Sequence, residues 1–210
     1  MNELEENELK NSILKGYNES PDLKGFVDER VDGKGIKWSK KNKNEEWTKM
    51  TKKVFAEIGE KFGFKIEDTE RSKEFMALDQ VWFNKENDEA VLALETENSA
   101  DFQVILRDEF RKLLNFKSDY KILIWYRLRK DEDEEKILEK FNKKVNGHSN
   151  TKNEVFFIIR LWQDGEVIGI TISALKYGKK RETSNYTIYN RSLNFTKVAK
   201  YDEDKKLWTK

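Results

Sequence analysis

Acidic side chains interrupt otherwise apolar segments between residues 75 and 128. Asp79 lies within FMALDQVWF, and Glu95 and Glu97 lie within VLALETEN. Side chains alternate along a strand, so Glu95 and Glu97 share one face, with α-carbons roughly 7 Å apart. Carboxylates buried without a partner cost free energy, and their mutual repulsion raises their pKa values unless a cation neutralises them. A fold for this chain must therefore accommodate three acids beside its core.

The spacing of apolar residues around these acids predicts an α/β fold. Five of them recur at helical spacing before Gly63: Trp47, Met50, Val54, Ile58 and Phe62. The segment NKEND at 84–88 favours a turn between two strands, and Asn98 or Ser99 can begin the next helix. The continuous apolar run 120–128 is typical of a central strand, parallel to the strand before the helix. The expected order is helix 45–62, strands 64–70, 74–83 and 89–97, helix 99–115 and strand 120–128.

The remaining sequence predicts further elements of the same domain. A charged amphipathic helix is expected at 131–145, and strands at 154–162 and 166–175 are joined by Gln163-Asp164-Gly165, a strong hairpin signal. One or two more strands follow in the tail. We interpret residues 45–210 as a single α/β domain and residues 1–44 as a partly irregular N-terminal arm with one short helix near 3–15.

Composition excludes several classes of site. The chain has no cysteine, which rules out disulfides and thiolate zinc sites, and its single histidine, His148, lies in a polar loop. The formal net charge is +1, so contact with nucleic acid would need a local basic patch. No apolar segment approaches the length of a membrane span, and we expect a cytoplasmic protein without membrane contact.

Oxygen ligands from carboxylates suit a hard divalent cation. Asp79, Glu95 and Glu97, with the backbone carbonyl of Thr96, form a candidate site for Mg²⁺ or Mn²⁺. Glu57 is a possible fourth acid, because it falls within roughly 20° of Met50 at the edge of the helix stripe. The competing interpretation is that these acids are solvated or paired with lysines, which are abundant in this chain.

The order α-β-β-β-α-β at 45–128 resembles the PD-(D/E)xK nuclease superfamily, which has the restriction-endonuclease-like fold. The resemblance implies that Asp79 and Glu95 bind the metal with the carbonyl of Thr96, and that Glu57 matches a helix glutamate found in many members. Glu97 occupies the position of the motif lysine, which gives ETE. Some restriction enzymes of this superfamily also carry glutamate there and cleave with two metal ions.

The resemblance implies a metal-dependent nuclease that hydrolyses phosphodiester bonds, with DNA as the favoured substrate. Glu97 could act as the general base or as a ligand of a second ion. Alternatively, a cation from the helix at 99–115 could replace the motif lysine, with Arg107, Arg111 and Lys112 as candidates. The resemblance implies a homodimer as one option, because many members act as dimers, but no sequence feature marks an interface and the oligomeric state stays open.

Two basic stretches with an aromatic residue could contact the phosphate backbone. Their candidate residues are Lys37, Lys40, Lys41, Lys179, Lys180 and Arg181. The alternative function is a catalytically inactive module with the nuclease fold, which binds nucleic acid or a protein partner. A glycosidase with paired carboxylates is less consistent with two glutamates on one strand.

Overall fold

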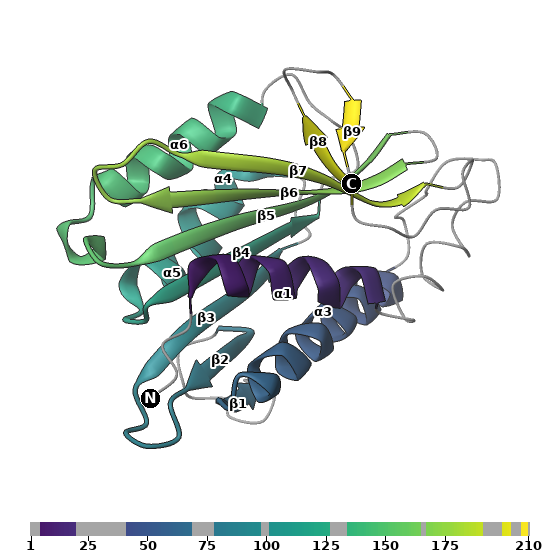
Figure 1. Ribbon diagram of the computed structural model, residues 1–210. Helices are drawn as coiled ribbons and strands as arrows, with labels where there is room; N and C mark the ends of the chain where they lie inside the picture. The colour runs from purple at the N-terminus through teal and green to yellow at the C-terminus, as the bar shows by residue number, and fades with distance from the viewer. Residues whose placement is uncertain are drawn as a thin grey trace.

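One mixed sheet organises the chain. The computed structural model describes residues 5–19, 41–68, 78–97, 101–126, 134–164, 167–190, 199–202 and 207–209 (Figure 1). In these residues nine strands form one sheet, ordered in space as in the sequence. The strands are β1 (Lys65–Asp68), β2 (Gln80–Phe83), β3 (Ala90–Glu97), β4 (Tyr120–Tyr126), β5 (Val155–Asp164), β6 (Val167–Lys176), β7 (Glu182–Asn190), β8 (Ala199–Asp202) and β9 (Leu207–Thr209). The predicted α/β class is confirmed.

Helices lie on both faces of the sheet (Figure 1). They are α1 (Glu6–Glu19), α3 (Lys41–Lys61), α4 (Phe102–Val104), the π-helix η2 (Ile105–Glu109), α5 (Phe110–Asn115), α6 (Glu134–Asn146) and the 3₁₀ turn η3 (Ser149–Thr151). None of the described helices is long and apolar enough to cross a membrane. From α3 to β4 the elements follow the expected order of helix, three strands, helix and strand.

The type of strand pairing changes twice across the sheet. β1, β2 and β3 are antiparallel neighbours, whereas β3, β4 and β5 are parallel. From β5 to β9 all neighbours are antiparallel. The expected parallel pair across the helix is therefore present between β3 and β4, and the carboxyl end of β3 carries Glu95 and Glu97.

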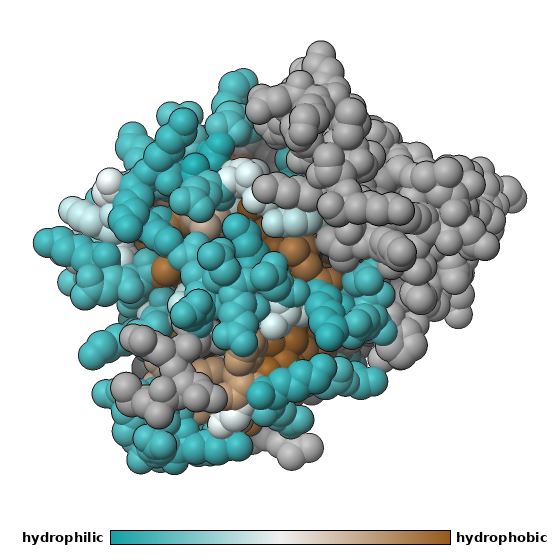
Figure 2. All heavy atoms as spheres, viewed as in Figure 1, coloured by the Kyte–Doolittle hydropathy of each residue, from teal (hydrophilic) through white to brown (hydrophobic). Residues whose placement is uncertain are grey.

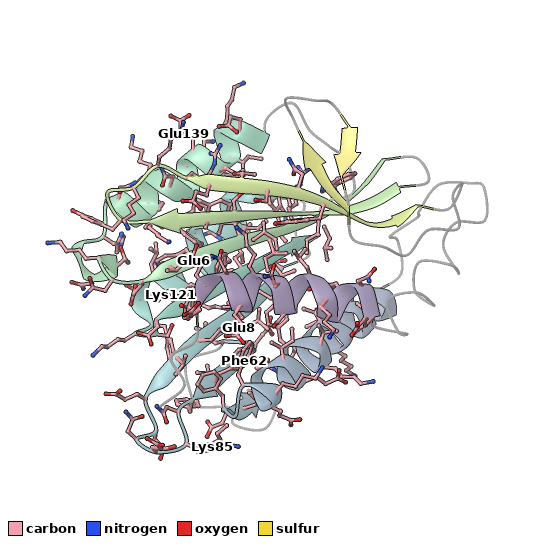
Figure 3. The ribbon with its side chains drawn as sticks, in the orientation of Figure 1. Glu6, Glu8, Phe62, Lys85, Lys121 and Glu139 are labelled. Atoms are coloured by element: carbon pink, nitrogen blue, oxygen red, sulfur yellow. The ribbon has the colours of Figure 1, made fainter. Side chains whose placement is uncertain are left out.

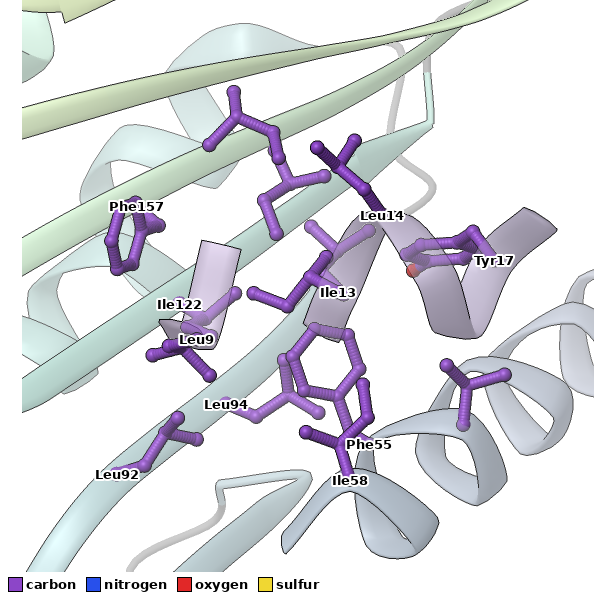
Figure 4. Close-up of a cluster of buried hydrophobic side chains, with 14 of the residues drawn as sticks. Leu9, Ile13, Leu14, Tyr17, Phe55, Ile58, Leu92, Leu94, Ile122 and Phe157 are labelled. Carbon is purple, nitrogen blue, oxygen red and sulfur yellow. The ribbon is translucent and has the colours of Figure 1, made fainter. Parts of the chain in front are cut away.

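The first helix belongs to the core rather than to an accessory arm. Leu9, Ile13 and Tyr17 of α1 are fully buried and belong to one apolar cluster with α3 and the sheet (Figure 4). The outer side of α1 is hydrophilic (Figure 2). The arm expected at 1–44 therefore contributes a core helix, because its apolar residues recur at helical spacing and cover the sheet beside α3.

The opposite face is covered by α4, η2, α5 and α6. The buried residues of this second cluster include Ile105, Phe110, Leu113 and Phe141, with Ala93, Leu123, Phe156 and Ile158 from the sheet. The observed helical segment of α4, η2 and α5 differs in two ways from the helix expected at 99–115. Asp101 caps it by accepting a hydrogen bond from the backbone N–H of Gln103, and a π-helical turn interrupts it. The expected caps Asn98 and Ser99 lie outside the described residues.

Side-chain hydrogen bonds join β2 to α3 next to Asp79. Gln80 is buried, and its Nε2 donates to the backbone carbonyl of Lys52 at 3.0 Å. Its Oε1 accepts from Nε1 of the fully buried Trp82 at 3.1 Å. Trp82 is thus a core residue, as are Trp125 and Trp162. The residue after Asp79 is thereby anchored to α3.

We expect Gly59→Ala to destabilise the fold, although alanine is the better helix former by about 1 kcal/mol. A Cβ at Gly59 would lie 2.4 Å from Cδ1 of Ile66 and 2.8 Å from Cε2 of Trp82. Such overpacking typically costs about 1–3 kcal/mol. Urea denaturation would measure the loss, with Glu60→Ala at the next, exposed position as the control. A more stable Gly59→Ala protein would contradict the close seating of α3.

Candidate active site

Glu95 is the buried carboxylate of the candidate site. It alternates along β3 with Ala93, which places it on the sheet face covered by α5. Its side chain is only 3% exposed. Burial and the neighbouring charge of Asp79 raise the pKa of Glu95 from 4.5 to about 9, while Lys112 opposes the rise. Glu95 is therefore protonated at neutral pH unless a further cation stabilises its ionised form.

Asp79 is fixed to the backbone of β3. Its N–H donates to the carbonyl of Leu94 at 3.1 Å, just before β2 begins. Its Oδ2 accepts two hydrogen bonds from Thr96, one from the backbone N–H at 2.7 Å and one from Oγ1 at 2.5 Å. Thr96 was expected to offer its carbonyl, and the structure shows that its donor groups also hold Asp79.

A lysine from the covering helix reaches the buried glutamate. Nζ of Lys112 lies 3.4 Å from Oε1 of Glu95, yet this oxygen accepts no hydrogen bond from a described residue. The same Nζ donates to Oε2 of Glu109. Burial lowers the pKa of Lys112, but the hydrogen bond with Glu109 and the charges of both glutamates raise it overall. Lys112 therefore remains an ammonium beside Glu95.

The π-helical turn explains which residues face the site. The N–H of Phe110 donates to the carbonyl of Ile105, five residues earlier, and both side chains are fully buried. In a regular helix Asp108 and Glu109 would share the face of Ile105. The wider turn gives that place to Phe110 and leaves Glu109 beside Lys112. Sequence reasoning missed this role of Glu109, although the five-residue spacing of Ile105 and Phe110 is a signal for it.

The other predicted site residues are more dispersed. Glu97 lies two residues beyond Glu95 on the same face of β3 and is half-buried. Glu57 is exposed on α3, whose buried residues pack against the opposite face, and it contacts none of these acids in the described residues. Its expected place in the site is therefore wrong. Among the alternative cations, Arg107 pairs with Asp108 and Arg111 is exposed, which leaves Lys112.

The predicted basic residues of the β6–β7 turn lie apart from the acids. Lys37 and Lys40 are outside the described residues, and Lys41 is the first residue of α3. Lys179 and Lys180 are exposed in the turn between β6 and β7, and Arg181 pairs with Glu135. This turn lies at the end of the sheet where β5 begins, whereas Glu95 and Glu97 lie towards the end of β3.

The donor set of the site limits how it could hold a divalent cation. Among the described residues, no three histidine or acidic side chains converge closely enough to hold a metal ion. Mg²⁺, however, usually keeps several waters and takes only one or two protein carboxylates. Asp79, Glu95 and Glu109 carry three negative charges when ionised, and Lys112 offsets one of them. The remaining charge of about −2 fits a divalent cation held by Asp79 and Glu95.

Comparisons with known proteins do not identify a family. No family model matches the chain, and no curated protein matches it. One similar solved structure is the central domain of yeast acetyl-CoA carboxylase, with 12% sequence identity and a TM-score of 0.46. The match covers 70% of this chain and 25% of that structure, so the chain spans about a quarter of its length.

We expect Glu95→Gln to stabilise the metal-free protein increasingly as pH rises. Wild-type Glu95 holds a proton in the folded state between its unfolded pKa of 4.5 and its folded pKa of about 9. The stability contribution of this proton is complete below 4.5 and is lost as pH approaches 9, at about 1.4 kcal/mol per pH unit. Glutamine mimics the protonated side chain at every pH.

Chemical denaturation at about pH 5.5 and about pH 8 measures this effect. The advantage of Glu95→Gln over wild type should grow by about 3 kcal/mol between these two conditions. Glu86→Gln, at an exposed turn position, is the matched control and should follow the wild type. If the free energies of unfolding of wild type and Glu95→Gln changed in parallel with pH, the raised pKa of Glu95 would be contradicted.

Proposed function

We propose that the protein is a metal-dependent nuclease that hydrolyses phosphodiester bonds, with DNA as the favoured substrate and Mg²⁺ or Mn²⁺ as the cofactor. The observation that carries this proposal is the buried Glu95 beside Asp79, with Lys112 at 3.4 Å. Perturbed carboxylates next to a specific charge partner favour a functional site. The ETE motif lacks a lysine, and Lys112 could substitute for it because its Nζ lies within contact distance of Glu95, the first acid of the motif.

Asp79 and Glu95 would hold the cation, which supplies charge neutralisation at the phosphate and activation of water. Lys112 would place its ammonium against the negative charge that develops on the phosphoryl oxygens. Glu109 keeps that ammonium in place, and the two hydrogen bonds from Thr96 orient Asp79. In this role Glu109 and Thr96 are positioning residues.

Glu97 would act as the general base of the reaction. Its carboxylate accepts a proton from the attacking water while the water oxygen bonds to phosphorus and the opposite P–O bond breaks. The leaving oxygen takes its proton from solvent. Glu97 suits this task because it shares the strand face of Glu95, is half-buried and lies one side-chain repeat further along β3.

One observation favours a second candidate function. The described residues lack a cluster of three acids, as expected if the chain has lost catalysis and binds nucleic acid or a protein partner. Such a module would bind its ligand equally well with glutamine at position 95. Cleavage and binding must therefore be measured on the same proteins.

The decisive experiment is cleavage of plasmid DNA, linear single-stranded DNA and structured RNA with Mg²⁺ or Mn²⁺. We expect metal-dependent cutting by the wild type, and a loss of about 100-fold or more in Glu95→Gln. Lys112→Met should lose about 10- to 100-fold at every metal concentration, because it removes a charge rather than a ligand. Glu86→Gln is again the control.

If the wild type and Glu95→Gln are equally inert, but both shift the mobility of a nucleic acid, the catalytic proposal fails and the binding module replaces it. A thermal shift supplies a readout that does not depend on cleavage. Mn²⁺ should raise the melting temperature of the wild type more at about pH 8.5 than at about pH 6.5, because the bound cation must displace the proton of Glu95.

Thr96→Val should weaken activation by the metal, whereas Thr96→Ser should behave like the wild type. Valine keeps the shape and the backbone N–H but removes the hydroxyl that donates to Asp79. A lost hydrogen bond to a charged group costs about 1.5–3 kcal/mol, which corresponds to roughly a 10- to 150-fold higher half-activating metal concentration. Equal half-activating metal concentrations for Thr96→Val and Thr96→Ser would show that the Thr96 hydroxyl does not contribute to the site.

A further inference from the structure

Two segments of the chain are basic and contain no acid. Residues 140–153 include four lysines, and residues 176–181 include three lysines and one arginine. Neither segment contains aspartate or glutamate, although 40 of the 210 residues are acidic. About one residue in five is acidic on average, so the absence from these twenty positions is a local departure in a chain of net charge +1.

The fold brings the two segments together. Oδ1 of Asn146, at the end of α6, accepts a hydrogen bond from the N–H of Gly178 in the turn between β6 and β7, at 2.6 Å. Nζ of Lys152 lies 5.8 Å from the ring centroid of Tyr177 in the same turn. The end of α6, the loop that follows it and the β6–β7 turn therefore form one continuous surface.

Five lysines define this feature, which we call the lysine surface: Lys143, Lys144, Lys152, Lys179 and Lys180. All five are exposed, and none forms an ion pair with a described residue. Basic residues at its margin are neutralised, since Lys176 pairs with Glu6 and Arg181 with Glu135. The positive charge is therefore concentrated on the five exposed side chains.

A structural explanation accounts for only part of this surface. Lys143 and Lys144 lie in the last turn of α6, where cations are favoured by the helix dipole. Lys152, Lys179 and Lys180 lie outside that helix, and the dipole does not require them. A polyanionic partner accounts for all five.

The lysine surface is remote from the acidic site. Glu95 pairs with Leu123, Leu123 with Ile158 and Ile158 with Ser173, three strands away on β6. Lys176 is three residues further along β6. With strands about 4.8 Å apart and about 3.3 Å per residue, the α-carbons of Glu95 and Lys176 are separated by roughly 17 Å. The turn that bears Lys179 and Lys180 lies further away.

We propose that the lysine surface is a second nucleic-acid contact, which binds the phosphate backbone at a distance from Asp79 and Glu95. This proposal rests on nucleic acid as the proposed substrate class, but it does not depend on catalysis. Each phosphate neutralised by a lysine contributes about 0.9 to the salt dependence of duplex binding. Five such contacts would therefore supply a salt slope of up to about 4.5, without sequence specificity.

The test is the binding of a fluorescent DNA duplex in metal-free buffer, where cleavage does not interfere. Two double charge reversals, K143E/K144E and K179E/K180E, remove opposite sides of the surface. The matched control is K61E/K85E, which changes net charge equally at exposed lysines that form no ion pair with a described residue. Lys85 lies on the β2–β3 turn, far across the molecule from Glu139 on α6 (Figure 3).

We expect each surface variant to weaken binding about tenfold or more and to reduce the salt slope by about 2, because two phosphate contacts are lost. The control should change affinity by less than about threefold. Equal losses in the control, unchanged binding in the surface variants, or wild-type binding to phosphatidylserine vesicles but not to DNA would overturn the proposal.

The test also separates the two proposals. If the wild type cleaves DNA but the surface variants bind it as tightly as the wild type, the lysine surface is wrong and the nuclease stands. If the surface variants lose binding while the wild type never cleaves, the nuclease is wrong and the lysine surface stands. If the wild type does not bind any nucleic acid, both proposals fail.

Discussion

The properties of the candidate site depend on the burial of one carboxylate, that of Glu95. Removing an ion from water costs several kcal/mol even after a protein relaxes around it. Lys112 offsets part of that cost, but it is itself held by Glu109, and its contact with Glu95 lacks a well-formed hydrogen bond. Protonation is the remaining way to reduce the cost in the absence of another cation. The fold therefore couples the stability of β3 to the protonation of Glu95, and the proposed metal would compete with that proton.

The two faces of the sheet differ in the side chains that the covering helices must place against them. On one face, α1 and α3 cover an apolar cluster, and the close approach of Gly59 to Trp82 requires a small residue there. On the other face, the helix after β3 must bury Ile105 and Phe110 and still present Lys112 to Glu95. A regular helix would orient Glu109 towards the core, and the π-helical turn resolves this conflict. The irregularity thus follows from combining a core contact with a charged contact in one short helix.

Local patterns predicted most of the fold and part of the site. The alternation in VLALETEN placed Glu95 and Glu97 on one face, and a run of strand, helix and strand was sufficient to predict the parallel pair β3–β4. The choice among Arg107, Arg111 and Lys112 required the helix register, which the π-helical turn alters. Glu57 was misplaced because its angle on the helix does not reveal which face of the sheet that helix covers. A short helix near 3–15 was predicted within the N-terminal arm, but its few apolar residues did not reveal that Leu9, Ile13 and Tyr17 would be fully buried.

A net charge near zero conceals a strong separation of charge along the sheet. Asp79, Glu95 and Glu97 lie towards the carboxyl end of β3, where Lys112 pairs with Glu95, while the opposite end of the sheet carries five exposed lysines without a described ionic partner. Scattered charges would neutralise one another locally and contribute little to binding or catalysis. Separated charges of opposite sign do not cancel one another, because exposed charges farther apart than about 8–10 Å are largely screened from one another in physiological salt. Each end can then interact with its own proposed partner, which is a cation at the acids and a phosphate backbone at the lysines. Overall composition is therefore a poor guide to the ligands of this protein, and the topology that sorts the charges is the better one.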